Sequence, residues 1–136
     1  MDEDRLLRVR DKINYITSVM TKIHSPAQIE LEKYGIFYLL QTVIETCIDL
    51  VAMITKDKGL DVQDDYMNID MLETNGTIPS SLAEKLRTAN GLRNRIVHQY
   101  NGFDETIALE SIDDIAEICD EWIQLVEAIY FDQASA

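Results

Sequence analysis

Residues that interrupt helices are scarce in this chain of 136 residues, which contains five glycines and two prolines. Apolar residues make up 46% of the sequence, which excludes a disordered chain, and the low glycine and proline content excludes a collagen-like one. No stretch shows the apolar–polar alternation of a half-buried strand. Length and composition therefore predict one globular, helical domain that is large enough to bury a substantial core.

Cysteine is scarce as well. Cys47 and Cys119 are too few and too far apart for a disulfide framework or a zinc site, and each lies among apolar residues. We therefore expect two buried free thiols and a cytoplasmic protein. The acidic residues 2–4 are not followed by an apolar segment, so we expect no signal peptide. The apolar runs are also too short to predict a membrane span.

Basic residues are the minority charge, with 12 Lys and Arg against 25 Asp and Glu and a net charge of −13. This balance argues against broad nucleic-acid binding and suits a basic protein partner. The segment from Glu84 to His98 differs from this acidic average, because it holds four basic residues and one acidic residue. From Gln99 to the end there are ten acidic residues and no Lys or Arg. The sequence thus predicts one local basic patch on an acidic protein.

Helical periodicity accounts for the first half of the chain. Apolar residues at steps of three and four predict a helix from Glu3 to Ile23. A second helix is predicted from Ser25-Pro26 to about Lys58, with Gly59 ending it. Its apolar residues form two seams, which predicts a central helix covered on two sides. The seams are Phe37, Ile44, Ile48 and Val51, and Leu40, Val43, Cys47, Leu50 and Ile54.

The second half predicts a short helix over 65–72 and a longer helix opened by residues 79–81. We expect Gly91 to interrupt or bend this helix before a helical segment over 92–100. Asn101-Gly102 predicts a turn, and Asp104 is expected to cap the last helix, which carries apolar residues through Ile129. The predicted fold class is all-α, an up-and-down four-helix bundle with a short additional helix.

The segment Arg93-Asn94-Arg95-Ile96-Val97-His98-Gln99-Tyr100 concentrates the chemistry of the chain. An imidazole moves protons near neutral pH, and a guanidinium stabilises the charge that builds on phosphate during metal-free phosphodiester cleavage. On a helix, Asn94 and His98 share a face, so the amide can orient the imidazole. Arg95 and Arg87 are candidate additional phosphate contacts. The other histidine, His24, precedes a helix start and is expected in a loop.

A structural alternative remains for the same residues. They could form an ordinary exposed amphipathic helix, with Leu92, Ile96 and Val97 as its buried side. The carboxylates of the second helix have no histidine beside them, so we expect no metal site. The chain also lacks a phosphate-cradling glycine loop and a serine-nucleophile motif.

A wider pattern resembles a known family. It comprises Ile78-Pro79 through Leu86, then Gly91-Leu92-Arg93-Asn94, His98-Gln99-Tyr100 and Asp104, preceded by Tyr38-Leu39-Leu40-Gln41 and Ile44 to Asp49. These residues resemble the HepT-like ribonucleases, the HEPN-domain toxins of prokaryotic toxin–antitoxin pairs. The resemblance covers nearly the whole chain, so residues 1–136 are expected to form a single HEPN domain.

The resemblance implies a homodimeric or larger assembly in which two motif copies meet at a cleft and cut RNA without metal or cofactor. Arg93, Asn94 and His98 would then be the catalytic residues. Tyr100 would correspond to the tyrosine that the cognate minimal nucleotidyltransferase (MNT) antitoxin modifies with AMP. The alternative is a non-catalytic HEPN module that binds a nucleotidyltransferase partner.

Overall fold

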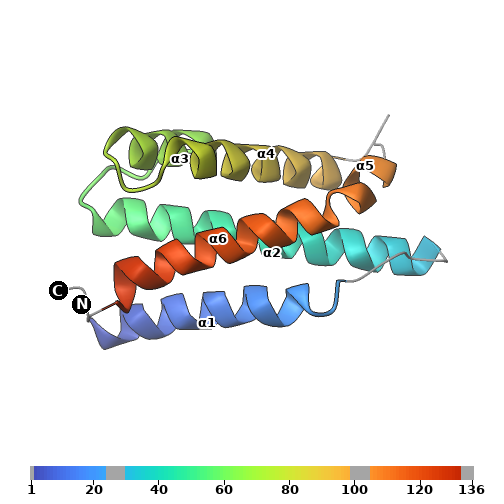
Figure 1. Ribbon diagram of the computed structural model, residues 1–136, viewed down its shortest axis with the longest axis horizontal. Helices are drawn as coiled ribbons and strands as arrows, with labels where there is room; N and C mark the ends of the chain where they lie inside the picture. The colour runs from blue at the N-terminus through green and yellow to red at the C-terminus, as the bar shows by residue number, and fades with distance from the viewer. Residues whose placement is uncertain (1, 24–29, 99–104, 133–136) are drawn as a thin grey trace.

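The computed structural model describes residues 2–23, 30–98 and 105–132, and the regular structure within these ranges is entirely helical. Four long helices alternate in direction along the chain, so that the start of the first and the end of the last lie at the same end (Figure 1). The predicted all-α, up-and-down bundle is therefore confirmed. The long helices are α1 (Glu3–Met20), α2 (Glu30–Asp57), α4 (Ser80–Val97) and α6 (Ile112–Tyr130), and the short ones are α3 (Asp65–Thr74) and α5 (Glu105–Glu110).

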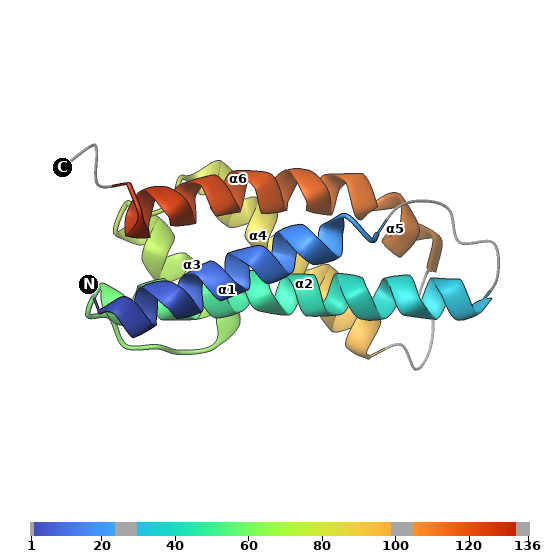
Figure 2. The same cartoon turned by 90° about the horizontal axis from the view of Figure 1, so that it is seen from below.

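Helix α2 is the central element, since α1, α3, α4 and α6 all pack against it (Figure 2). All nine residues of its two predicted seams are buried, which confirms the prediction of a helix covered on more than one side. The segment Leu31–Asp57 is also long and apolar enough to cross a membrane by length and composition alone. Half of the apolar window in this segment is buried inside the bundle. A helix that is buried on several sides needs an apolar composition as well.

Glycine ends two of the helices by the same mechanism. At the end of α2, Gly59 has a φ of 78°, its N–H donates to the Lys56 carbonyl, and the next N–H, of Leu60, donates to Thr55. At the end of α3, Gly76 has a φ of 81°, its N–H donates to the Glu73 carbonyl, and the N–H of Thr77 donates to Leu72. This is the Schellman motif, in which a left-handed residue turns the chain back to satisfy the last carbonyls. Gly59 thus ends the helix as predicted.

Four predicted helix boundaries were wrong, and one of them is the end of the motif helix, which lies at Val97 and not at Tyr100. Helix α1 ends at Met20, although Ile23 is still buried, because the following turn is tightened by a bond from the Lys22 N–H to the Val19 carbonyl. Helix α4 runs through Gly91 without interruption. A glycine costs a helix only about 1 kcal/mol relative to alanine, which packing against the neighbouring helices outweighs.

The fourth error concerns the last helix, which is divided into α5 and α6 at Ser111. The Ser111 hydroxyl donates to the Ile107 carbonyl at 2.7 Å. The Ser111 N–H donates to the carbonyls of both Ile107 and Ala108. Such back-bonding by serine competes with the regular helical ladder. The predicted start of the second helix at Ser25-Pro26, the Asn101-Gly102 turn, the Asp104 cap and the loop position of His24 lie outside the described residues.

A charged cluster joins three helices at the end of the bundle where α1 begins. The Asp57 carboxylate on α2 accepts from Arg5 Nε on α1 at 3.0 Å and from the Tyr130 hydroxyl on α6 at 2.5 Å. Burial alone would raise the pKa of Asp57, but the hydrogen bonds from Arg5 and Tyr130 outweigh it and lower that pKa. Burial and the bond to Asp57 together raise the pKa of Tyr130.

We predict that Asp57→Asn lowers the free energy of unfolding at pH 7 by about 1–3 kcal/mol, because it removes a charge-assisted acceptor shared by two donors. Since the folded-state pKa of Asp57 is lowered, its contribution is complete above the unfolded value of about 4 and is lost as the pH falls further.

Urea denaturation of wild type and variant between pH 3 and pH 7 tests this, with the more exposed Asp49→Asn as the control. Asp49 pairs with Lys12 at 3.3 Å, and its side chain is 60% exposed. A stability difference for Asp57→Asn that stays constant down to pH 3 would contradict the prediction.

Candidate active site

The last two turns of α4 carry the motif residues that the structure describes. Leu92 and Ile96 are buried and hold this part of the helix against the core. Arg93 and Asn94 are partly exposed, Arg95 is exposed, and Val97 is only half-buried. Leu92 and Ile96 thus form the buried side that the amphipathic-helix alternative predicts, and the polar motif residues occupy the other faces of the same helix.

Arg93 is held by a residue from the central helix. Its Nε and Nη2 atoms donate to Glu45 Oε1 on α2 at 3.2 and 3.1 Å, and its Nη1 donates to Asn94 Oδ1 at 3.0 Å. Glu45 Oε1 also accepts from Gln41 Nε2 at 3.2 Å. The guanidinium is therefore fixed by two acceptors on different helices.

Among the residues that the structure describes, Glu45 and Asn94 occupy only part of the guanidinium. Arginine has five N–H donors, and the bonds to Glu45 and Asn94 use three of them. The remaining two donors belong to the two terminal nitrogens, the pair that binds phosphate in a bidentate manner. A guanidinium held on one edge and available on the other can stabilise a developing negative charge without first having to be ordered.

A polar hollow of about 250 Å³ lies beside Arg93, between α2, α4 and the start of α3. Glu45, Asp49 and Asp65 line it, together with Asn90 and Ile48. Asn90 is 1% exposed, and its Oδ1 atom has no hydrogen-bond partner among the described residues. The hollow thus has three carboxylates and one arginine in its lining, a balance that disfavours phosphate within it.

His98 is the first residue after α4 and is exposed. Its backbone N–H donates to the Asn94 carbonyl at 3.0 Å, so the helical spacing between these two residues is kept although the helix itself ends at Val97. The helical segment was predicted to continue to Tyr100. Asn94 was predicted to orient the imidazole, and in the structure its side-chain oxygen accepts from Arg93.

The two additional arginines occupy different environments. Arg87 is surrounded by Asp70, Glu73 and Glu84, which all accept hydrogen bonds from its guanidinium. These bonds raise the pKa of Arg87. Three carboxylates already neutralise it, so we do not include it in a phosphate site. Arg95 is exposed on the last turn of α4.

Sequence reasoning did not find the part that Glu45 plays. The sequence shows that Gln41 and Glu45 are four apart on one helix, but nothing in it links Glu45 to Arg93, which follows 48 residues later. Tyr100, the predicted modification site, lies outside the described residues. Among the described residues, no group of three or more His, Cys, Asp or Glu side chains is placed to hold a metal ion.

Comparison with known proteins identifies the family. The family model described as HepT-like, ribonuclease HepT-like, matches residues 10–128. The chain belongs to the HepT-like ribonuclease family. Two curated proteins of Archaeoglobus fulgidus, each named "Putative RNase", are 40% and 36% identical to it. The alignments cover 90% and 91% of this chain and 92% and 89% of those proteins.

Solved structures of HEPN toxins share the fold. A chain from the toxin–antitoxin complex MntA-HpeT superposes with a TM-score of 0.78 at 21% identity, covering 88% of this chain and 98% of that one. The tri-AMPylated HEPN toxin of Shewanella oneidensis, in complex with its MNT antitoxin, gives a TM-score of 0.73 at 23% identity. That match covers 94% of this chain and 99% of the toxin. The HepT-like family member described here therefore has the fold of a HEPN toxin.

Proposed function

We propose that this chain is a metal-independent endoribonuclease, the toxin of a HEPN/MNT toxin–antitoxin pair, and that its whole length forms one HEPN domain. The observation that carries the proposal is the fixed guanidinium of Arg93, which Glu45 and Asn94 hold at the end of the helix that leads to His98. Membership of the HepT-like family and the names of the Archaeoglobus fulgidus relatives support it.

The chemistry proposed is attack of a ribose 2′-hydroxyl on the adjacent phosphate. Arg93 stabilises the negative charge of the pentacoordinate phosphate, and Asn94 keeps its guanidinium in place. His98 moves a proton at the 2′-hydroxyl or at the leaving oxygen. Arg95, exposed on the same turn, is an additional phosphate contact. Because the nucleophile is the 2′-hydroxyl, DNA is not a substrate.

A dimer accounts for the second proton transfer. The reaction needs a base at the nucleophile and an acid at the leaving group, and the motif supplies one histidine per chain. A surface for association lies on the same helix as Glu45, where Leu31, Tyr34 and Tyr38 form an exposed stripe at steps of three and four. This half of α2 is at the same end of the bundle as the end of α4 (Figure 1).

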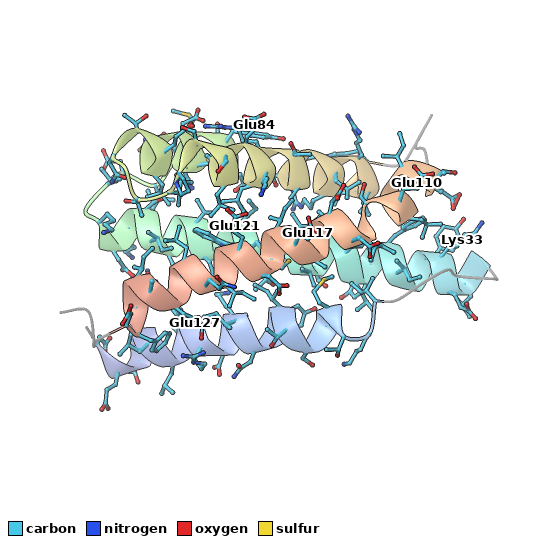
Figure 3. All side chains as sticks on the ribbon, in the orientation of Figure 1. Lys33, Glu84, Glu110, Glu117, Glu121 and Glu127 are labelled. Atoms are coloured by element: carbon cyan, nitrogen blue, oxygen red, sulfur yellow. The ribbon has the colours of Figure 1, made fainter. Side chains whose placement is uncertain are left out.

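The non-catalytic module remains the second candidate, and the charge of the chain favours it. Figure 3 shows Glu117, Glu121 and Glu127 spaced along α6, with Glu110 on α5 before them. Glu121 pairs with Lys85 and Glu127 pairs with Arg10, but the net charge of −13 still disfavours RNA and suits a basic protein partner. The solved structures that share the fold are complexes of a toxin with an antitoxin. RNA cleavage by the purified chain separates the two candidates.

We predict that Arg93→Ala and His98→Ala each reduce RNA cleavage by more than about 100-fold, the scale of one electrostatic or acid–base contribution. Glu45→Gln should cause a smaller loss, because Arg93 keeps its bond to Asn94. Melting should change little in all three variants, since Arg93 and His98 are not core residues. Cleavage of a labelled RNA, with circular dichroism on each variant, measures both effects.

The matched control is Arg8→Ala, which removes an exposed arginine from α1 and should cleave at the wild-type rate. Cleavage should also continue in EDTA. Loss of cleavage on chelation would rule out the metal-free mechanism, and full cleavage by Arg93→Ala would remove this residue from the site. A wild-type chain that binds a nucleotidyltransferase but never cuts RNA would establish the non-catalytic module.

We predict that the chain is at least a dimer at micromolar concentration and that Tyr38→Glu shifts it toward the monomer, because a charge in the exposed stripe opposes its burial. Multi-angle light scattering of both proteins tests this. Leu7→Glu is the control, since Leu7 is similarly exposed at 61% but lies on α1. A monomeric wild type would contradict the dimer.

We predict that the cognate MNT antitoxin, supplied with ATP, adds AMP to Tyr100 and that the modified chain loses cleavage while staying folded. Tyr100 follows His98 by two residues, so an AMP group adds negative charge and bulk near Arg93 and Arg95 and competes with RNA phosphate. Intact-mass measurement shows the adduct. Tyr100→Phe should remain unmodified and active, and an adduct of the same mass on that variant would assign the modification elsewhere.

A further inference from the structure

The two thiols of the chain lie side by side in the core, although the proposed reaction uses neither. Cys47 on α2 and Cys119 on α6 are 72 residues apart in sequence, and their sulfur atoms are 3.9 Å apart. Both residues are buried and present as free thiols. The sequence contains two cysteines, and the packing of α6 on α2 brings these two together.

One of the two cysteines lies beside a surface hollow, although it is only 2% exposed. A hollow of about 300 Å³ between α1 and α6 is lined by Cys119, together with Met20, Ala116 and Ile123. Cys47 does not line it. The hydrogen bond with Cys119 and burial both raise the pKa of the Cys47 thiol. Because Cys119 lines the hollow, it is the first of the two thiols that an oxidant entering there would meet.

We propose that Cys47 and Cys119 form an oxidisable dithiol site that hydrogen peroxide converts to a disulfide joining α2 to α6. Cys119, as the thiolate, attacks one peroxide oxygen, the O–O bond breaks, and hydroxide leaves and takes up a proton to become water. The sulfur of Cys47 then displaces the second oxygen from the resulting sulfenic acid, and the thiol proton leaves with it as water. Two thiols and one peroxide thus give one disulfide and two waters, with the sulfurs oxidised and the peroxide reduced.

The geometry requires a limited movement. A disulfide has its sulfur atoms about 2.05 Å apart, so the pair must approach by roughly 2 Å, which rotation of two side chains and a small shift of the helices can provide. The bond would close a loop that contains the last part of α2, all of α3, α4 and α5 and the start of α6. Cross-linking so long a segment restricts the unfolded chain and stabilises the fold.

The chain carries its own reporter of this bond. Trp122 is the single tryptophan, it is fully buried, and its Nε1 donates to the Cys47 carbonyl at 3.1 Å. It also follows Cys119 by three residues on α6 and so lies on the same face of that helix. A disulfide at this position therefore forms next to the indole and should quench its fluorescence.

The experiment treats the folded wild-type chain with hydrogen peroxide under native conditions and then alkylates it in denaturant with N-ethylmaleimide. We expect no alkylation, a mass lower by two hydrogens, a monomeric band on a non-reducing gel, quenched Trp122 emission and a melting temperature higher by on the order of 10 °C. Dithiothreitol should reverse all of these changes.

Two variants separate the steps. Cys47→Ala should stop at the sulfenic acid of Cys119, which dimedone traps, whereas Cys119→Ala should give no dimedone adduct, because Cys47 does not line the hollow. Met20 lines the same hollow, and its oxidation to the sulfoxide shows independently that peroxide has entered. Two alkylatable thiols in the treated wild type overturn the proposal, whether or not Met20 is oxidised. A disulfide between chains, or a lower melting temperature after oxidation, also overturns it.

Discussion

Helix α2 must bury apolar residues on more than one side at once, and the rest of the bundle is arranged to meet that requirement. Each buried aliphatic or aromatic side chain contributes roughly 1.5–3 kcal/mol, and the two seams of α2 supply eight such residues besides Cys47. Helices α1, α4 and α6 run alongside it and α3 covers its end. A helix held on several sides cannot rotate, so the direction of each of its polar side chains is fixed as well.

The polar residues of α2 use this rigidity. Glu45 lies between buried neighbours, Ile44 on one side and Cys47 two positions later, and from there its carboxylate reaches α4 and fixes Arg93. Arg93 is thereby held by a side chain from the most constrained helix of the fold. The cost of ordering the guanidinium is met during folding, which leaves it ready to stabilise charge on a ligand.

The same packing explains two other polar contacts that reach α2. The Cys47 carbonyl accepts from Trp122, and the Asp57 carboxylate accepts from Arg5 and Tyr130. In each case a donor from α1 or α6 meets an acceptor whose position α2 has already set. The position of Arg93, the thiol pair and the cluster that joins the first and last helices therefore depend on one buried helix.

The sequence by itself determined the fold class and the central position of α2, and it singled out the segment that we propose as the active site. These follow from local information: the spacing of apolar residues fixes which faces are buried, Gly59 fixes where α2 ends, and the motif residues are neighbours along the chain. Tertiary structure decided the rest. Gly91 remains inside α4 because neighbouring helices support it, Ser111 divides the last helix, and Arg87 is occupied by carboxylates from α3.

The partners of the motif were also decided by tertiary structure. Glu45 meets Arg93, and Cys47 meets Cys119, only after helices far apart in sequence have packed together. The rotation of one packed helix relative to another depends on how all their side chains fit at once. This fit depends on the whole core and not on any local pattern in the sequence. The sequence therefore indicates which residues have reactive side chains, but not which residues from other helices will contact them.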